Sequence, residues 1–388
     1  MRTETHDMPE SRADAGCGCA PAAQAPPCCG SGRPTRADVP FADSFVDEWL
    51  DTPAGRVAHV TTRLDWRDTA GRWARRWGIG RAGYRVAPGL YAVGEPGAAS
   101  PVLLTANYKM TFDALRKELG GQDAWVLVLD TFGINVWCAA GKGTFGTEEV
   151  VRRVKAAGLE RLVSHRTLVL PQLGAPGVGA HEVRNGCGFK VVYGPVYARD
   201  IKRFLADGMK ATPGMRRVEF PVTERLALAP VEVVGSLRPA RWLAPALFLL
   251  AGIGPGIFSP AAAWHRGLAA VCVLAAGIVA GAVVTPVLLP WLPGKTFSGK
   301  GALVGAVAAA AALAWGESPP ASLHGLALLL ALPAISSFVA MNFTGSTPFT
   351  SPSGVEKEMR RAMPVQALAA ALAAAFWIGG AFVRLARP

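Results

Sequence analysis

The pattern of hydrophobic and polar positions changes abruptly near Arg238 in this chain of 388 residues. Before that point charged residues are frequent and the apolar runs are short, as in the strands of a globular domain. After it, long stretches consist of Ala, Leu, Val and Gly with hardly a charge. A helix needs about 20 apolar residues to cross a bilayer. The pattern therefore predicts a soluble domain followed by a membrane domain.

The first part alternates strand-like and helix-like segments from Val102 onward, which predicts a mostly parallel, Rossmann-like α/β sheet over residues 101–237. The expected strands are residues 102–105, 124–129, 167–170, 189–193 and 218–222. The expected helices are residues 111–119, 147–157 and 197–206. Residues 41–100 form an N-terminal extension in this prediction. Its Trp- and Arg-rich piece, residues 66–77, fits either contact with lipid headgroups or a partner, or an ordinary packed helix.

The second part, residues 238–388, predicts an all-α transmembrane domain of five helices. The apolar segments are residues 241–258, 267–292, 301–315, 323–341 and 364–383. The first is interrupted by Gly254-Pro255-Gly256 and the third is short, so each alone also fits a buried or re-entrant helix. Tryptophans near the ends of the runs favour five spans, because Trp is enriched at membrane interfaces.

Basic residues predict the orientation of these spans, since cytoplasmic loops carry an excess of Lys and Arg. They cluster before the first span, between the second and third, and before the fifth (Arg238, Arg241, Lys295, Lys300, Lys357, Arg360, Arg361). Residues 1–15 are polar and lack the apolar core of a signal peptide. We therefore expect a multi-pass protein of the cytoplasmic membrane with its N-terminal domain in the cytoplasm. The net charge of +12 then suits anionic lipid, and no nucleic-acid motif is present.

A cysteine follows the apolar run 124–129, at the expected carboxyl end of a strand. In open α/β sheets ligands bind at these ends. Asn135 is suited to cap a short helix over residues 136–140, which Gly141 can close. Cys138 would then project from one turn of helix. The alternative is a buried structural cysteine in a βα turn.

Several familiar site motifs are missing around this loop. There is no Gly-x-Gly-x-x-Gly after the first predicted strand, and Gly141-Lys142-Gly143 fails the phosphate-loop pattern. The Asp-x-His-x-x-Gly signature of corrinoid domains that bind cobalt through histidine is also absent. A corrinoid in this chain would need another lower ligand, and Cys138 is the candidate.

The run Asn-Val-Trp-Cys-Ala-Ala-Gly-Lys, residues 135–142, resembles the cap-helix signature of the HgcA family, the membrane-bound corrinoid proteins of microbial mercury methylation. The resemblance extends from about Pro101 to Arg361 through residues 170–178, 192–196 and 342–347. A more distant resemblance is to the corrinoid iron-sulfur protein of the acetyl-CoA pathway.

The HgcA resemblance implies a methyltransferase with a cobalamin cofactor that passes a methyl group from cobalt to inorganic Hg(II), giving methylmercury. It makes Cys138 the lower axial cobalt ligand. It further implies that the corrin and its nucleotide tail are bordered by residues of three strand-tip loops: Asn135, Val136, Trp137, Ala139, Gly141, Lys142, Gly174, Gly177, Tyr193 and Gly194. By sequence alone the last two loops are also consistent with plain turns.

The resemblance also implies partners. The chain has no Cys-x-x-Cys-x-x-Cys run, so we expect no iron-sulfur cluster of its own. Returning oxidised cobalt to Co(I) needs a low-potential electron donor, which implies a ferredoxin-like protein with [4Fe-4S] clusters. A methyl donor protein or a methyl-folate system must supply the methyl group.

Other cysteines give weaker predictions. Residues 1–40 have the composition of a disordered tail, and their thiol pairs (Cys17 with Cys19, Cys28 with Cys29) suit either capture of Hg(II) or no role. Cys187 and His181 are further possible ligands, more typical of a turn thiol and a surface residue. Cys272 lies in a predicted span, where a packing role is expected.

Two other functions fit the same sequence. One is a corrinoid methyl carrier of the acetyl-CoA pathway type with a different acceptor. The other is a membrane transporter or sensor with a cytoplasmic ligand-binding domain, although its spans would then contain almost no ionisable residues. The connection at residues 342–361 is polar and long, and we expect it to dock against the soluble domain or the ferredoxin.

Overall fold

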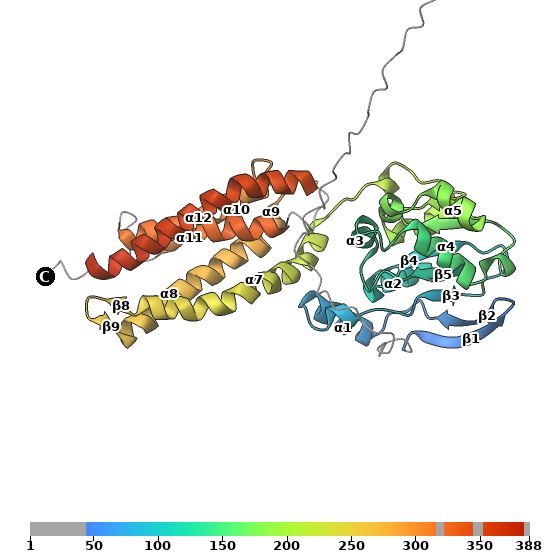
Figure 1. Ribbon diagram of the computed structural model, residues 1–388, viewed down its shortest axis with the longest axis horizontal. Coiled ribbons are helices and arrows are strands. Elements are labelled where there is room, and N and C mark those ends of the chain that lie inside the picture. Colours follow the sequence, from blue (N-terminus) through green and yellow to red (C-terminus); the bar gives the residue numbers. More distant parts are fainter. Residues whose placement is uncertain (1–43, 316–321, 344–351, 384–388) are drawn as a thin grey trace, which may run out of the picture. The chain divides into compact units, whose positions relative to one another are not determined.

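The structure, a computed structural model, describes residues 44–315, 322–343 and 352–383 (Figure 1). It contains an α/β part followed by a helical part. The predictions for Cys17, Cys19, Cys28 and Cys29 lie outside the described residues, as does the segment 344–351 of the predicted docking connection.

The α/β part is built on a seven-stranded sheet in the order β1-β2-β3-β5-β4-β6-β7. The bounds are β1 Val46–Thr52, β2 Gly55–Val60, β3 Gly89–Val93, β4 Val102–Ala106, β5 Ala124–Leu129, β6 Thr167–Leu170 and β7 Lys190–Tyr193. Strands β5, β4, β6 and β7 are mutually parallel, as predicted. Strands β1 to β3 lengthen the same sheet through antiparallel β1–β2 and β3–β5 pairs, so the sheet is mixed and the predicted extension contributes to it.

The parallel half of the sheet has a topological switch point. The chain goes from β4 to β5 on one side and then crosses to β6 on the other side of β4. Loops after β4 and β6 therefore leave in different directions, and the crevice between them is where α/β sheets bind ligands.

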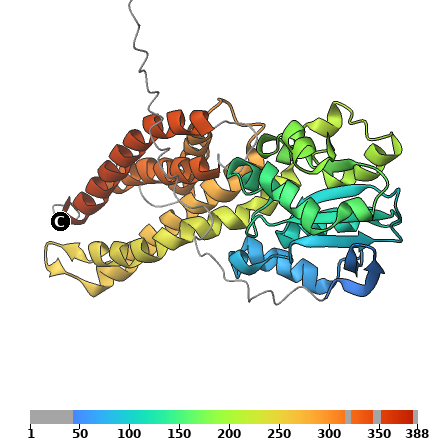
Figure 2. The same cartoon turned by 45° about the vertical axis from the view of Figure 1, so that its right-hand side comes forward.

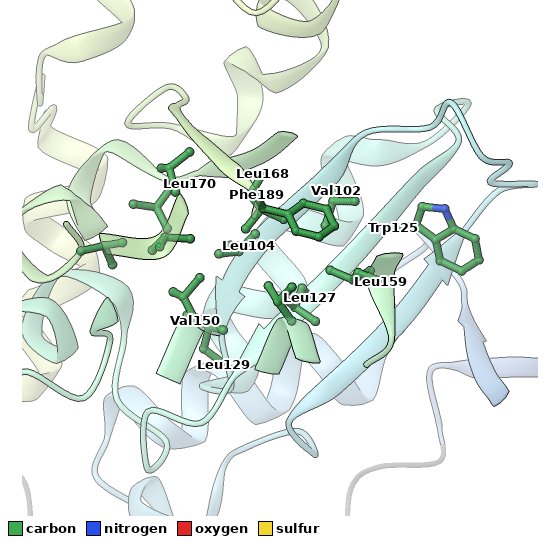
Figure 3. Packing of buried hydrophobic residues seen from close by; sticks show 14 of the residues in the cluster. Val102, Leu104, Trp125, Leu127, Leu129, Val150, Leu159, Leu168, Leu170 and Phe189 are labelled. Atoms are coloured by element: carbon green, nitrogen blue, oxygen red, sulfur yellow. The ribbon is translucent and has the colours of Figure 1, made fainter. Parts of the chain in front are cut away.

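Helices cover both faces of the sheet (Figure 2). They are α1 Trp66–Arg76, α2 Lys109–Arg116, α3 Val136–Gly141, α4 Thr147–Ala156, α5 Ala180–Cys187 and α6 Ile201–Ala206, with a 3₁₀ segment η4 at Gln172–Gly177. Successive residues of a strand point to opposite faces. Leu127 accordingly packs in one buried cluster with Leu104 and Phe189 (Figure 3), and Val126 in the other with Phe112.

One predicted strand is wrong. Residues 218–222 form no strand; instead a long helix, α7, spans Val222–Ala251. Pro221 precedes it and has no N–H for a sheet, while Phe220 has a φ of 51°, outside the strand region. The other predicted helices and strands of this part are confirmed to within a few residues.

The helical part comprises α7, α8 Pro260–Val279, α9 Thr285–Leu288, α10 Phe297–Trp315, α11 Leu323–Asn342 and α12 Pro352–Val383. A π-helical turn, Ala280–Val284, joins α8 to α9. Within the described ranges four helical stretches are long and apolar enough to cross a membrane: 260–288, 297–315, 323–342 and 353–383. These candidate spans are compatible with membrane association.

Two predictions for this part need correction. Residues 241–258 are not one helix, because α7 ends at Ala251 and the Gly254-Pro255-Gly256 stretch turns a small hairpin, β8 Ile253–Gly254 with β9 Ile257–Phe258. Residues 352–361 of the predicted connection are not a loop but the first turns of α12. There Glu358 Oε1 accepts a hydrogen bond from the backbone N of Ser298, 2.6 Å away, and so caps α10.

Candidate functional site

One buried side chain, that of Asn107, holds the loop after β5 in place. Asn107 directly follows β4. Its Oδ1 accepts hydrogen bonds from the backbone N of Thr131 at 3.1 Å and of Gly133 at 2.9 Å. Its Nδ2 donates to Asp130 Oδ1 at 3.0 Å. Phe132 and Gly133 have φ of 57° and 74°, a left-handed turn that costs energy at the phenylalanine. Asn107 therefore stabilises a strained turn directly before α3.

Helix α3 has the predicted form. Asn135 caps it, and its Oδ1 accepts from the backbone N of Cys138 at 2.9 Å. Val136 and Ala139 point into the core, whereas Cys138 is exposed. The exposure rules out the alternative of a buried structural cysteine, and the role of Cys138 as a ligand stays a prediction.

Two large apolar side chains lie exposed in the same loop. Phe132 is 56% and Trp137 is 42% accessible to solvent. Exposed aromatic residues next to an exposed sulfur offer a flat apolar ligand both contact area and a soft atom.

Gly174 and Gly177 of η4 pack against α3 and the segment that follows it. A Cβ on Gly174 would lie 2.5 Å from Phe145 Cε1. A Cβ on Gly177 would collide with the carbonyl oxygen of Phe145 and lie 3.0 Å from Ala140 Cα. These contacts explain both glycines through protein packing alone; their predicted contact with a corrin stays a prediction.

A cavity of about 370 Å³ opens beside α3 at the carboxyl ends of β4, β6 and β7. Its wall includes Thr105, Asn135, Trp137, Pro171, Gly194 and Tyr197. It is mostly apolar with a few polar groups, as is typical of small-molecule sites. The structure thus brings four of the predicted site residues, Asn135, Val136, Trp137 and Gly194, to one cavity at the switch point.

Helix α4 is joined to the loop by a buried carboxylate. Glu149 Oε1 accepts from the backbone N of Asp130 at 2.8 Å, and the side chains of Arg152 and Arg153 pair with the same carboxylate. Sequence reasoning missed Glu149, Asn107 and Phe145. Each of these three residues contacts a segment that lies 10 or more residues away along the chain. Only Asn107 had a signal in the sequence, because it is a polar residue directly after a predicted strand.

The remaining predicted residues lie elsewhere. Tyr193 is half-buried and its hydroxyl donates to Val178 O at 3.1 Å, which ties β7 to η4. Lys142 and His181 are exposed. Cys187 is half-buried at the end of α5, with Sγ 3.2 Å from Val183 O. Among the described residues no group of three His, Cys, Asp or Glu side chains is placed to hold a metal ion.

These residues fit a corrinoid better than a bare metal ion. Cys138 offers a single exposed sulfur, and a cobalt ion held in a corrin ring would need only one such ligand from the protein. The exposed rings of Phe132 and Trp137 suit the apolar edge of the macrocycle.

Residues 80–205 match the family model of the CO dehydrogenase/acetyl-CoA synthase delta subunit. The matched range runs from just before β3 to α6 and includes α3 and the cavity. Helix α7 and the candidate membrane spans lie outside it.

Curated relatives match about a quarter to a third of the chain. Subunit gamma of the acetyl-CoA decarbonylase/synthase complex from Archaeoglobus fulgidus is 35% identical over 127 residues, 32% of this chain and 27% of that protein. The subunit gamma from Methanopyrus kandleri is 34% identical over 122 residues, 31% and 26% of the two chains. The one from Methanosarcina acetivorans is 37% identical over 107 residues, 26% and 23%. The chain thus spans about a quarter of the length of these relatives.

Proposed function

We propose that this protein is a corrinoid-dependent methyltransferase that passes a methyl group from cobalt to inorganic Hg(II), with Cys138 as the lower axial ligand. The observation that carries the proposal is the exposed Cys138 on a capped helix beside a cavity, in the segment that matches the family model of the CO dehydrogenase/acetyl-CoA synthase delta subunit. The Hg(II) acceptor is supported by the likeness of residues 135–142 to the HgcA signature.

A bound corrinoid supplies the cobalt that carries the methyl group. Hg(II) is an electrophile, so the methyl group has to reach it as a carbanion or radical equivalent. A thiolate at Cys138 would hold the cobalt and would donate more charge to it than an imidazole, which favours that transfer. Asn135 keeps the sulfur in place by capping α3, and Trp137 and Phe132 would exclude water from the bound group.

The proposal requires partners. An electron donor, for which a ferredoxin-like protein with [4Fe-4S] clusters is suitable, must restore Co(I) after transfer. A methyl donor protein or a methyl-folate system must then reload the methyl group. We further propose a multi-pass protein of the cytoplasmic membrane, with the α/β domain in the cytoplasm.

The relatives, which are subunits of acetyl-CoA decarbonylase/synthase complexes, favour a second candidate: a methyl carrier that serves another acceptor in a complex of that type. Both candidates use Cys138 and the same cavity. They differ in the acceptor, so an assay with several acceptors separates them.

The test uses full-length protein in detergent, loaded with methylcobalamin, and compares wild type with Cys138→Ala and Cys138→His. We expect the wild type to bind the cofactor with a spectrum typical of thiolate ligation and to give methylmercury from Hg(II). Cys138→Ala should fold yet lose transfer, because α3 is a single turn whose core contacts come from Val136 and Ala139. Cys138→His should retain cofactor but lose transfer.

Two results decide against the proposal. Full transfer by Cys138→Ala shows that the thiol is not the ligand, and a wild-type protein that cannot be loaded with cobalamin rules out both corrinoid candidates. Cofactor loading with transfer only to a non-mercury acceptor selects the second candidate.

A further inference from the structure

Helix α1 carries a row of tryptophans on its outer face. Trp66, Trp73 and Trp77, the C-cap, are spaced i, i+7 and i+11, which places them within about 40° of one another around a helix of 3.6 residues per turn. They are 74%, 51% and 47% exposed, and Ile79, just after the helix, is 64% exposed. We call these four residues the Trp row. An apolar row of this size on a surface marks an interaction site.

The opposite face of α1 is fixed to the α/β domain by buried charges. Asp68 is 5% exposed and receives hydrogen bonds from Lys109 at 2.5 Å and Arg116 at 2.6 Å. Burial raises the pKa of Asp68, but the hydrogen bond and charges from Lys109 and Arg116 outweigh it and hold the pKa below its ordinary value. Asp65 closes a capping box with Asp68. The helix therefore cannot turn the Trp row inward without breaking this network.

Arginines flank the Trp row. The Arg67 guanidinium lies 5.6 Å from the ring centre of Trp66, and that of Arg76 lies 5.6 Å from that of Trp73. Residues 63–81 contain six arginines and two aspartates, and both aspartates are engaged within the domain. The outer face of α1 is thus apolar along its centre and cationic at its sides.

We infer that α1 is a membrane-surface helix that docks the α/β domain on an anionic lipid leaflet. Trp rings prefer the headgroup level, and arginines beside them attract anionic lipid. A bilayer is favoured over a protein partner because the same chain carries four candidate spans, which place lipid within reach of the domain. The charge of the flanks is complementary to such a leaflet. This inference is independent of the chemistry at Cys138.

The test measures hydrogen exchange, by mass spectrometry, of the full chain in nanodiscs of phosphatidylcholine alone and of phosphatidylcholine with phosphatidylglycerol. We expect the amides of residues 66–79 to exchange more slowly in the anionic nanodiscs. Trp66→Ala, Trp73→Ala and Trp77→Ala together should abolish the difference. The matched control is Trp49→Ala on β1, which is 53% exposed and should retain it.

The charge contribution is tested with Arg67→Gln and Arg76→Gln, and with Arg184→Gln on α5 as control. Each of the first two should reduce the extra protection about fivefold, the equilibrium equivalent of the ~1 kcal/mol that one arginine contributes at an anionic surface. Equal exchange in both kinds of nanodisc overturns the inference. So does protection of the Trp row in detergent that rises with protein concentration, because a second copy then covers it.

Discussion

At the scale of single residues, the sequence predicted the local geometry of the Cys138 loop but not the distant contacts that hold the loop in place. The Asn135 cap and the outward Cys138 follow from local rules that link a capping side chain to the next turn. Asn107 could not be assigned in this way, because it lies 24 residues before Thr131 and meets it only through the pairing of β4 with β5. Contacts of that kind depend on strand order, which local pattern does not encode.

Asn107 gives the first prediction at this scale. Asn107→Ala leaves the backbone N–H groups of buried Thr131 and half-buried Gly133 without their acceptor. Each unsatisfied buried donor costs about 1–3 kcal/mol, so we expect unfolding to become easier by about 3 kcal/mol. The left-handed turn at Phe132 should relax and cobalamin loading should fall. Thermal unfolding and loading of the purified full-length protein measure both.

Asn185→Ala on α5 is the matched control for that experiment. Asn185 is exposed, so its substitution should change neither thermal unfolding nor cobalamin loading. If Asn107→Ala unfolds like the wild type and loads normally, the turn is held by other contacts and the positioning role of Asn107 is wrong.

At the scale of elements, prediction succeeded where periodicity and turn residues agreed. Strand β5 is an unbroken apolar run between Asp123 and Asp130, and α4 has Glu148 in its first turn and Gly158 just beyond its end. It failed at residues 218–222, where β-branched residues favoured a strand but Pro221 starts a helix. The antiparallel pairing of β3 with β5, which makes the sheet mixed, was also not predicted, because it joins segments that are 35 residues apart in the sequence.

The packing of α3 on η4 provides a prediction about two elements. Gly177→Ala places a methyl group against the backbone of Phe145 and Ala140, neither of which is a flexible chain end. Overpacking of this kind costs about 1–3 kcal/mol, and α3 should shift with it. We expect a lower thermal midpoint and a weaker or altered cobalt–thiolate band in the visible spectrum.

Gly141→Ala serves as the control on the same site. Its Cβ would meet nothing within 4 Å and it lies in the last turn of α3, where alanine favours a helix. It should leave stability unchanged or raise it slightly. If both variants lose the band equally, close packing at Gly177 is not what positions the helix.

At the scale of the whole molecule, hydropathy located the apolar segments but not the start of the helical part. Helix α7 begins at Val222, well before the change in composition at Arg238, and its first half carries charges such as Glu224 and Arg225. Because of this composition, α7 is not one of the four candidate spans. Whether α7 belongs with the candidate spans has to be judged from its packing, which cannot be read from the sequence.

Helix α7 pairs with α8 through a tight turn. The hairpin β8–β9 joins their ends, Arg266 Nη1 donates to Ala251 O at 2.9 Å, and Gly267 lies against Phe248. The two helices therefore run antiparallel over the last turns of α7. Because α8 with α9 is a candidate span of 29 residues, we predict that its antiparallel neighbour α7 crosses the same layer. A helix of 30 residues is about 45 Å long, which is enough.

This pairing leads to a prediction about topology. Five crossings place the C-terminus on the opposite side of the membrane from the α/β domain, whereas four would place both on the same side. We expect alkaline phosphatase fused after Pro388 to be active and green fluorescent protein fused there to be dark, while the fluorescent fusion truncated at Lys295, after two crossings, should be bright. A fluorescent C-terminal fusion would show that α7 does not cross, because the number of crossings after the α/β domain would then be even.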